Sequence, residues 1–212
     1  MTADLSVLVL AGGAARRLGG RKADRRVGDR RLVDQVVDVA RKLSDDVILL
    51  PGDRRLDVPG TRKVPDAQAI DGPLSGLLAG LTTAQRAWSL LLPCDMPQVS
   101  ARVVRRLLAA REGDAEAIVV HDGQRLQPFH GLYHRDLVTR LGAYLSAGGR
   151  SLTGLLERVR LAGHLRGLPL ALLGEDADGR FLRDIDTPDA LRRLRRARAR
   201  AVRALTSERS QP

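Results

Sequence analysis

Short runs of Val, Leu and Ile recur along the chain and alternate with longer segments in which apolar residues follow a helical spacing. The clearest runs predict strands over residues 6–10, 47–50, 89–92 and 117–120, and weaker runs lie at 131–133 and 180–185. Short continuous apolar runs are typical of strands whose two faces are both covered by helices. The pattern therefore predicts an α/β fold with a mostly parallel central sheet flanked by helices.

Helices are predicted between these strands. One apolar stripe with helical spacing consists of Leu32, Val33, Val36, Val37, Ala40 and Leu43. Ser100 is the expected N-cap of a second helix, whose inward-facing residues are Val103, Val104, Leu107 and Leu108. A last helix is expected to begin at residues 187–189, because Thr caps helices, Pro fits the first turn and Asp favours the positive helix end.

The length of 212 residues suits one domain with a sizeable core, and we expect residues 1–203 to form it. Residues 204–212 lack an apolar face, so we expect this tail to fray. No apolar run approaches the roughly 20 residues needed to span a bilayer, and residues 1–4 lack the positive segment of a signal peptide. The single Cys94 excludes an internal disulfide. These features predict a cytoplasmic protein without a membrane partner.

The net charge of +11 is concentrated in two places. Residues 16–31 carry eight cations against two acids, a net +6, and residues 192–212 carry eight arginines against one glutamate, a net +7. The rest of the chain is therefore at −2. With only two Phe, two Tyr and one Trp, the chain offers few side chains for stacking on bases. The distribution argues against nucleic-acid binding, and we interpret the arginine-rich end as a solvated helix.

A segment rich in glycine and cations, LAGGAARRLGGRK (residues 10–22), follows the first predicted strand. In an open parallel sheet, the loop after the first strand is the usual place for a phosphate. Glycines let backbone N–H groups approach a ligand, and Arg and Lys add positive charge. The segment lacks the Gly-Lys-Ser/Thr sequence that closes a P-loop, and it lacks the GxGxxG spacing of dinucleotide-binding loops. It indicates polyphosphate binding, and a glycine-rich turn with exposed cations is the alternative.

Carboxylates follow other predicted strands. Asp95 in PCDMP comes directly after the run at 89–92, where it would be a hard oxygen ligand for Mg²⁺ on phosphate oxygens or, alternatively, a turn residue. The segment DGPLSG (residues 71–76) places two glycines at the start of a further predicted helix, whose free N–H groups suit a base or a phosphate. Asp184 and Asp186 lie two residues apart at the end of the last run.

These motifs resemble a known family. LAGGAARRLGG with Lys22 after it, DGPLSGLLAG, PCDMP, VVHDGQRLQPFHGLY and FLRDIDTPDAL have the order and spacing seen in the molybdenum cofactor guanylyltransferases, over roughly residues 5–195. The resemblance implies a three-layer Rossmann-like nucleotidyltransferase fold. Family enzymes transfer GMP from GTP to the terminal phosphate of molybdenum-bound molybdopterin and release pyrophosphate. It also implies Mg²⁺ as cofactor and a monomer, with other molybdenum cofactor biosynthesis proteins or chaperones of apo-molybdoenzymes as further partners.

The resemblance also assigns residues. Those placed against the guanine nucleotide are Leu10, Ala11, Gly12 and Gly13, with Arg17 and Lys22 on its phosphates. Asp66 matches a nucleotide-contacting Asp, Asp95 matches the magnesium ligand, and Gly72 and Gly76 match the glycines of the GPLAG turn. Arg17, Lys22 and Asp95 are the implied catalytic residues.

The chain departs from the family pattern in places. Arg21 stands where the family usually has Asp, the loop is one residue shorter, and Asp184 and Asp186 replace residues that are often Asn. These two acids either ligate a second metal or cap the final helix. Two other functions stay open: a molybdopterin cytidylyltransferase, whose relatives tend to read LAAG instead of LAGG, and a non-catalytic nucleotide or nucleic-acid binding protein.

The four histidines are interpreted as surface or substrate-edge residues. His130 and His134 are four apart, which separates them by roughly 13 Å on an extended segment, too far to share a metal ion.

Overall fold

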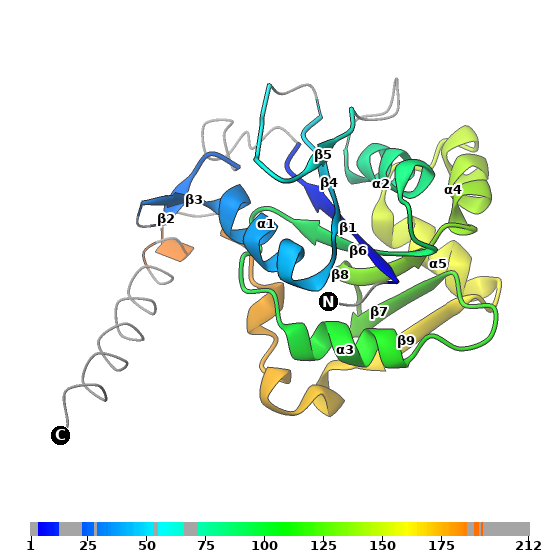
Figure 1. The fold of residues 1–212 in the computed structure, drawn as a ribbon. Coiled ribbons are helices and arrows are strands. Elements are labelled where there is room, and N and C mark those ends of the chain that lie inside the picture. Colours follow the sequence, from blue (N-terminus) through cyan, green and yellow to red (C-terminus); the bar gives the residue numbers. More distant parts are fainter. Residues whose placement is uncertain are drawn as a thin grey trace.

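The computed structural model describes residues 4–12, 23–27, 29–52, 55–65, 72–185, 189–190 and 192. Its centre is a seven-stranded sheet in the order β5-β4-β1-β6-β8-β7-β9 (Figure 1). The strands are β1 (Leu5–Leu10), β4 (Asp46–Leu50), β5 (Arg62–Lys63), β6 (Trp88–Pro93), β7 (Ala117–His121), β8 (Leu126–His134) and β9 (Leu165–Pro169). β8 runs antiparallel to β6 and β7, and the other neighbouring pairs are parallel. The predicted α/β fold with a mostly parallel sheet is confirmed.

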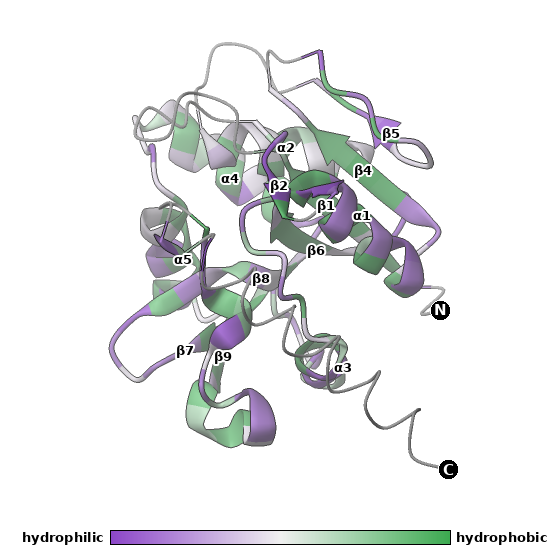
Figure 2. Cartoon of the chain, turned by 90° about the vertical axis from the view of Figure 1, so that its left-hand side faces the viewer, coloured by the Kyte–Doolittle hydropathy of each residue, from purple (hydrophilic) through white to green (hydrophobic). Residues whose placement is uncertain are grey.

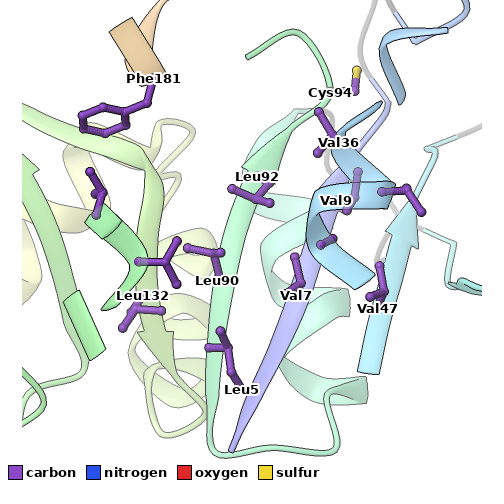
Figure 3. Close-up of a cluster of buried hydrophobic side chains, with 14 of the residues drawn as sticks. Leu5, Val7, Val9, Val36, Val47, Leu90, Leu92, Cys94, Leu132 and Phe181 are labelled. Carbon is purple, nitrogen blue, oxygen red and sulfur yellow. The ribbon is translucent and has the colours of Figure 1, made fainter. Parts of the chain in front are cut away.

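Helices cover both faces of this sheet (Figure 1). One face packs against α1 (Leu32–Leu43) and α3 (Ala101–Ala109), and the other against α2 (Pro73–Thr83), α4 (Leu137–Ser146) and α5 (Leu152–Leu161). Alternate residues of β1 enter different layers: Val7 and Val9 point toward the α1 side, as Figure 3 shows, and Leu8 packs on the α2 side. This alternation makes the strand apolar on both faces and explains its continuous apolar run.

The predicted helical stripes face the core. In α1, Leu32, Val33, Val36, Val37 and Ala40 are buried, as is the polar Gln35, and the exposed positions of the helix carry charged residues (Figure 2). Ser100 caps α3 by accepting a hydrogen bond from the Val103 N–H at 3.3 Å, and the four predicted inward residues are buried. No helix within the described ranges has both the length and the apolar character that a membrane span requires.

Other sequence predictions need correction. The weak run at 131–133 belongs to the longer strand β8, and the run at 180–185 is not a strand. Residues Arg180–Leu182 form a short 3₁₀ helix, η3, because β9 pairs with β7 at that edge of the sheet and the later segment crosses over the α3 side instead. The hairpin of β2 (Arg26–Val27) and β3 (Arg30–Arg31), the strands β5 and β9, the helices α4 and α5, and the 3₁₀ segment η2 (Leu170–Asp176) were not predicted.

The last predicted helix is described only at residues 189, 190 and 192, which are helical. Its predicted cap at Thr187-Pro188 and the tail 204–212 lie outside the described residues. The domain boundary at residue 203 therefore stays a prediction.

A buried carboxylate joins the amino ends of β1, β4 and β5. The Asp46 side chain is 2% exposed and accepts hydrogen bonds from Ser6 Oγ (2.6 Å) and the Gln85 N–H (2.9 Å). Arg62 of β5 adds two donors, Nη2 at 2.7 Å and Nε at 3.1 Å. Burial raises the pKa of Asp46, but the bonds from Ser6, Gln85 and Arg62 outweigh it and hold the pKa below its usual value.

Replacing this carboxylate should destabilise the fold. We expect Asp46→Ala to lower the free energy of unfolding by about 3 kcal/mol or more, because it leaves buried donors without an acceptor. Urea unfolding measures the loss. The matched control is Asp45→Ala, which removes a surface ion pair with Arg86 (3.2 Å) and should cost less than about 1 kcal/mol. Equal losses in both variants would contradict the structural role of Asp46.

Strand β8 carries a bulge that buries a histidine. Its pairing with β7 shifts register between Ile118 and Val120, and His130 takes a left-handed φ of 57° at this point. His130 is 1% exposed, so its interpretation as a surface or substrate-edge residue was wrong. Burial lowers its pKa to about 4, although the backbone of Met96 acts in the opposite direction. The other three histidines are partly exposed.

This burial predicts acid sensitivity. The folded pKa of about 4 lies below the ordinary value of 6.5, so the unfolded chain binds more protons between these pH values. Stability should therefore fall as the pH drops below 6.5, by about 3 kcal/mol in total at pH 4. The measurement is urea unfolding across this range for the wild type and His130→Phe, which cannot titrate. The free energy of unfolding should fall with pH by this amount more in the wild type than in His130→Phe. Equal pH dependence in the two proteins would contradict a lowered pKa of His130.

Candidate functional site

The strands β1, β4 and β6 end side by side, at an edge of the sheet that we term the carboxyl edge. Leu50 O, at the end of β4, accepts hydrogen bonds from the Ala11 N–H (2.9 Å) and the Gly12 N–H (3.1 Å). On the other side of β1, the Cys94 N–H donates to Leu10 O at 2.9 Å. The structure thus brings together the predicted residues Leu10, Ala11 and Gly12 and the turn that contains Asp95.

Gly12 has a packing role that was not predicted, and its contact with the nucleotide stays a prediction. A Cβ built on Gly12 would lie 3.0 Å from Gly52 N and 3.1 Å from Pro51 C, in the loop after β4. The glycine is needed because two backbones pass each other here. Since the N–H groups of Ala11 and Gly12 already bond Leu50 O, donors to a phosphate have to come from other residues. Gly13, Arg17, Lys22 and Asp66 lie outside the described residues.

The start of α2 reaches the same edge, because this helix runs back toward the amino end of the sheet before β6 begins. Gly72 precedes it with φ 103° and ψ −173°, a conformation open only to glycine, and Pro73 occupies the first turn. Gly72 is the N-cap residue and has no side chain that could cap the helix. Gly76 is buried one turn further. The predicted helix with two glycines at its start is therefore confirmed, and contact of these glycines with a ligand stays a prediction.

Asp95 lies on the turn directly after β6 and is partly buried. Its carbonyl oxygen accepts a hydrogen bond from the Ile185 N–H at 2.9 Å, and the Met96 N–H donates to Pro93 O at 3.3 Å. Asp184, next to Ile185, is exposed, whereas Asp186 lies outside the described residues. The described residues hold no group of three or more metal-ligating side chains. A single hard carboxylate nevertheless suits Mg²⁺, which usually keeps several waters and binds substrate phosphates.

His130 and Phe181 were not predicted from the sequence as part of this region. Both are buried close to the turn that contains Asp95. Their rings stack with centroids 5.5 Å apart and an interplanar angle of 21°. Phe181 also lies at one end of the apolar layer that contains Leu132 (Figure 3). A signal was available, because His130 stands two residues before the buried Leu132 and so shares its face of an extended strand.

The described part of the basic stretch is locally neutralised. Arg31 binds Asp34 through Nη2 at 2.6 Å and Nε at 2.8 Å, and this hydrogen-bonded pair raises the pKa of Arg31 and lowers that of Asp34. Arg30 pairs with Asp38. These contacts fasten the β2–β3 hairpin to α1, so much of its positive charge is already matched within the protein.

An open pocket of about 670 Å³ lies beside Phe181, between the segment that precedes α3 and the residues around the end of η2. Its lining includes Glu175, Asp176 and Asp178. Three carboxylates make it unsuited to a polyphosphate, even though Arg102 pairs with Glu175 at 2.7 Å. The edge around Leu10, Gly72 and Asp95 is the better candidate.

Comparisons with known proteins agree with this geometry. Residues 7–162 match the family model of the MobA-like NTP transferase domain. The chain is 33% identical over 153 residues to the molybdenum cofactor guanylyltransferase of Vibrio parahaemolyticus, covering 69% of this chain and 77% of that protein. It is 35% identical over 164 residues to the protein of the same name from Pseudomonas putida, covering 74% and 85%.

A solved structure shares the fold. The molybdopterin-guanine dinucleotide biosynthesis protein A of Archaeoglobus fulgidus superposes with a TM-score of 0.77 at 20% identity, over 92% of this chain and 99% of that one. The predicted three-layer nucleotidyltransferase fold is confirmed. With the family match over more than half of the chain and relatives above 30% identity, the protein belongs to the MobA-like NTP transferase family and is a nucleotidyltransferase.

Proposed function

We propose that the protein transfers GMP from GTP to the terminal phosphate of molybdenum-bound molybdopterin, releasing pyrophosphate. The names of its relatives support the two substrates. The observation that carries the proposal is the position of Asp95: its turn is bonded to the end of β1 through Cys94 N–H and Leu10 O, at the edge reached by the start of α2. A carboxylate near the start of a helix suits a nucleotide that arrives with a divalent cation, because the positive end of the helix dipole favours negative charge there.

The reaction joins two anions. A terminal phosphate oxygen of molybdopterin attacks the α-phosphorus of GTP, the bond from this phosphorus to the bridging oxygen breaks, and pyrophosphate leaves. The attacking phosphate is already ionised near pH 7, so no general base is needed. Catalysis then depends on positioning and on neutralising charge.

The residues divide this work. Asp95 would hold Mg²⁺, which when bound neutralises phosphate oxygens and orients them. The start of α2 would favour the negative charge of the nucleotide, because the positive end of the helix dipole lies there. Arg17 and Lys22 would stabilise the departing pyrophosphate, by their match to the family motif. Leu10 and Ala11, fixed by the bonds to Cys94 and Leu50, would form the wall against the nucleotide.

The base preference provides a first test. We expect GTP to bind at least about tenfold more tightly than CTP or ATP, a difference of about 1.4 kcal/mol, in the same magnesium buffer. Isothermal calorimetry with the three nucleotides measures it. Tighter binding of CTP would assign the protein to molybdopterin cytidylyl transfer, and no binding of any nucleotide would overturn the proposal.

The charge of Asp95 provides a second test. Asp95→Asn keeps the size of the side chain but removes the charge that would hold the cation. We expect single-turnover GMP transfer at saturating GTP to slow at least about 100-fold, or about 2.7 kcal/mol of transition-state stabilisation, with a smaller loss of GTP affinity.

The matched control for this variant is Asp45→Asn, which makes the same change at an exposed position beside the amino end of β4. It should transfer GMP at the wild-type rate. An Asp95→Asn protein that stays within threefold of the wild type across a magnesium titration would leave Asp95 as a turn residue.

A further inference from the structure

His130 occupies an unusual place for a histidine. It is buried in the middle of β8. Its left-handed φ of 57° costs a non-glycine residue about 1 kcal/mol or more. Within the part of the chain that the structure describes, neither ring nitrogen has a hydrogen-bond partner of good geometry. Strain and buried polar atoms both lower stability, so the surrounding structure has to hold this residue in place, and such features concentrate at functional sites.

The bulge around His130 is firmly built. Tyr133 Oη donates to Pro128 O at 2.5 Å and so ties the two ends of the bulge together. A Cβ on Gly131 would lie 2.9 Å from Val119 Cγ1 and 3.3 Å from Ile118 O, so this residue has to be glycine for β8 to pass β7. The backbone of His130 is therefore set by its neighbours, which turn the ring toward the α3 side of the sheet.

The ring contacts both chain segments that determine where Asp95 lies. One is the turn itself, since the backbone of Met96, the residue after Asp95, is close enough to the imidazole to raise its pKa against the effect of burial. The other begins at Phe181, whose ring stacks on His130, and ends at Ile185, whose N–H donates to Asp95 O. Residues 181–185, which we term the strap, thus cross from the imidazole to the backbone of Asp95.

We propose that His130 is a positioning residue for Asp95: its ring, turned inward by the left-handed backbone, holds the Met96 turn and the strap together and so places the Asp95 carboxylate at the nucleotide site. The expected effect on catalysis rests on the proposed function, since it requires that Asp95 acts in GMP transfer. It assigns His130 no contact with substrate, because the ring is enclosed between the strap and the sheet. The effect of removing the ring should therefore reach the reaction only through Asp95.

Two variants separate the ring's shape from its nitrogens. His130→Ala removes the stack on Phe181, whereas His130→Phe keeps a ring of similar outline. Leu141→Ala is the matched control, since Leu141 is fully buried on α4, on the opposite face of the sheet. It should lose stability without disturbing the strap.

The primary measurement is amide hydrogen exchange, which needs neither substrate nor activity. In His130→Ala we expect the amides of Met96 and Ile185 to exchange at least about tenfold faster than in the wild type, because the contacts that protect them are loosened. His130→Phe should stay within about threefold of the wild type. In Leu141→Ala, the exchange rates of the Met96 and Ile185 amides should change only in proportion to those of the β1 amides.

The second measurement is GMP transfer across a magnesium titration. For His130→Ala we expect kcat to fall at least about tenfold and half-maximal activity to need at least about threefold more Mg²⁺, with the KM for GTP nearly constant. His130→Phe should recover both quantities, and Leu141→Ala should alter neither after correction for folded protein.

Wild-type exchange at Met96 and Ile185 in His130→Ala would overturn the inference, and so would His130→Phe that is as impaired as His130→Ala. A wild-type protein that transfers no GMP would overturn the proposed function instead, and the exchange rates would still decide whether His130 holds the turn.

Discussion

The hydrogen bonds across the ends of β1, β4 and β6 are the constraint on which the candidate site depends. Leu50 O takes two N–H groups from the start of the loop after β1, and Leu10 O takes one from Cys94. Together they hold three loops that come from distant parts of the chain. Because these bonds are between backbone atoms, they fix loop position independently of the side chains that perform the chemistry.

Two glycines, Gly12 and Gly72, have structural roles at this edge of the sheet. Gly12 lets two loops pass within contact distance, and Gly72 supplies a backbone angle at the start of α2. Both glycines thus shape the edge of the sheet. A glycine-rich loop in a nucleotidyltransferase therefore serves packing between loops as well as close approach to a phosphate.

The antiparallel strand β8 adds a second level of organisation. A parallel strand between β6 and β7 would bring its carboxyl end to the site, whereas β8 brings its amino half there. That half contains the bulge and His130, so the ring reaches the strap and the turn of Asp95 from inside the sheet. The burial that places the imidazole there also lowers its pKa.

Much of the architecture was determined by the sequence alone. The apolar runs located β1, β4, β6 and β7, the stripes located α1 and α3, and the motifs located the turn of Asp95 and the start of α2, because burial on both faces and helix capping leave local patterns. Short strands such as β5 and the helices α4 and α5 were not predicted, because their patterns are weak or masked by glycine and arginine.

Only the tertiary structure decided what the local patterns do together. The run at 180–185 looks like a strand, yet it becomes the strap, because β9 takes the neighbouring position in the sheet. His130 looks like one of four polar residues, yet the bulge buries it. The hydrogen bonds from the Ala11 and Gly12 amides to Leu50 join residues that are 39 and 38 positions apart along the chain. Such long-range pairings leave no periodic signal, and they are what turns separate motifs into a site.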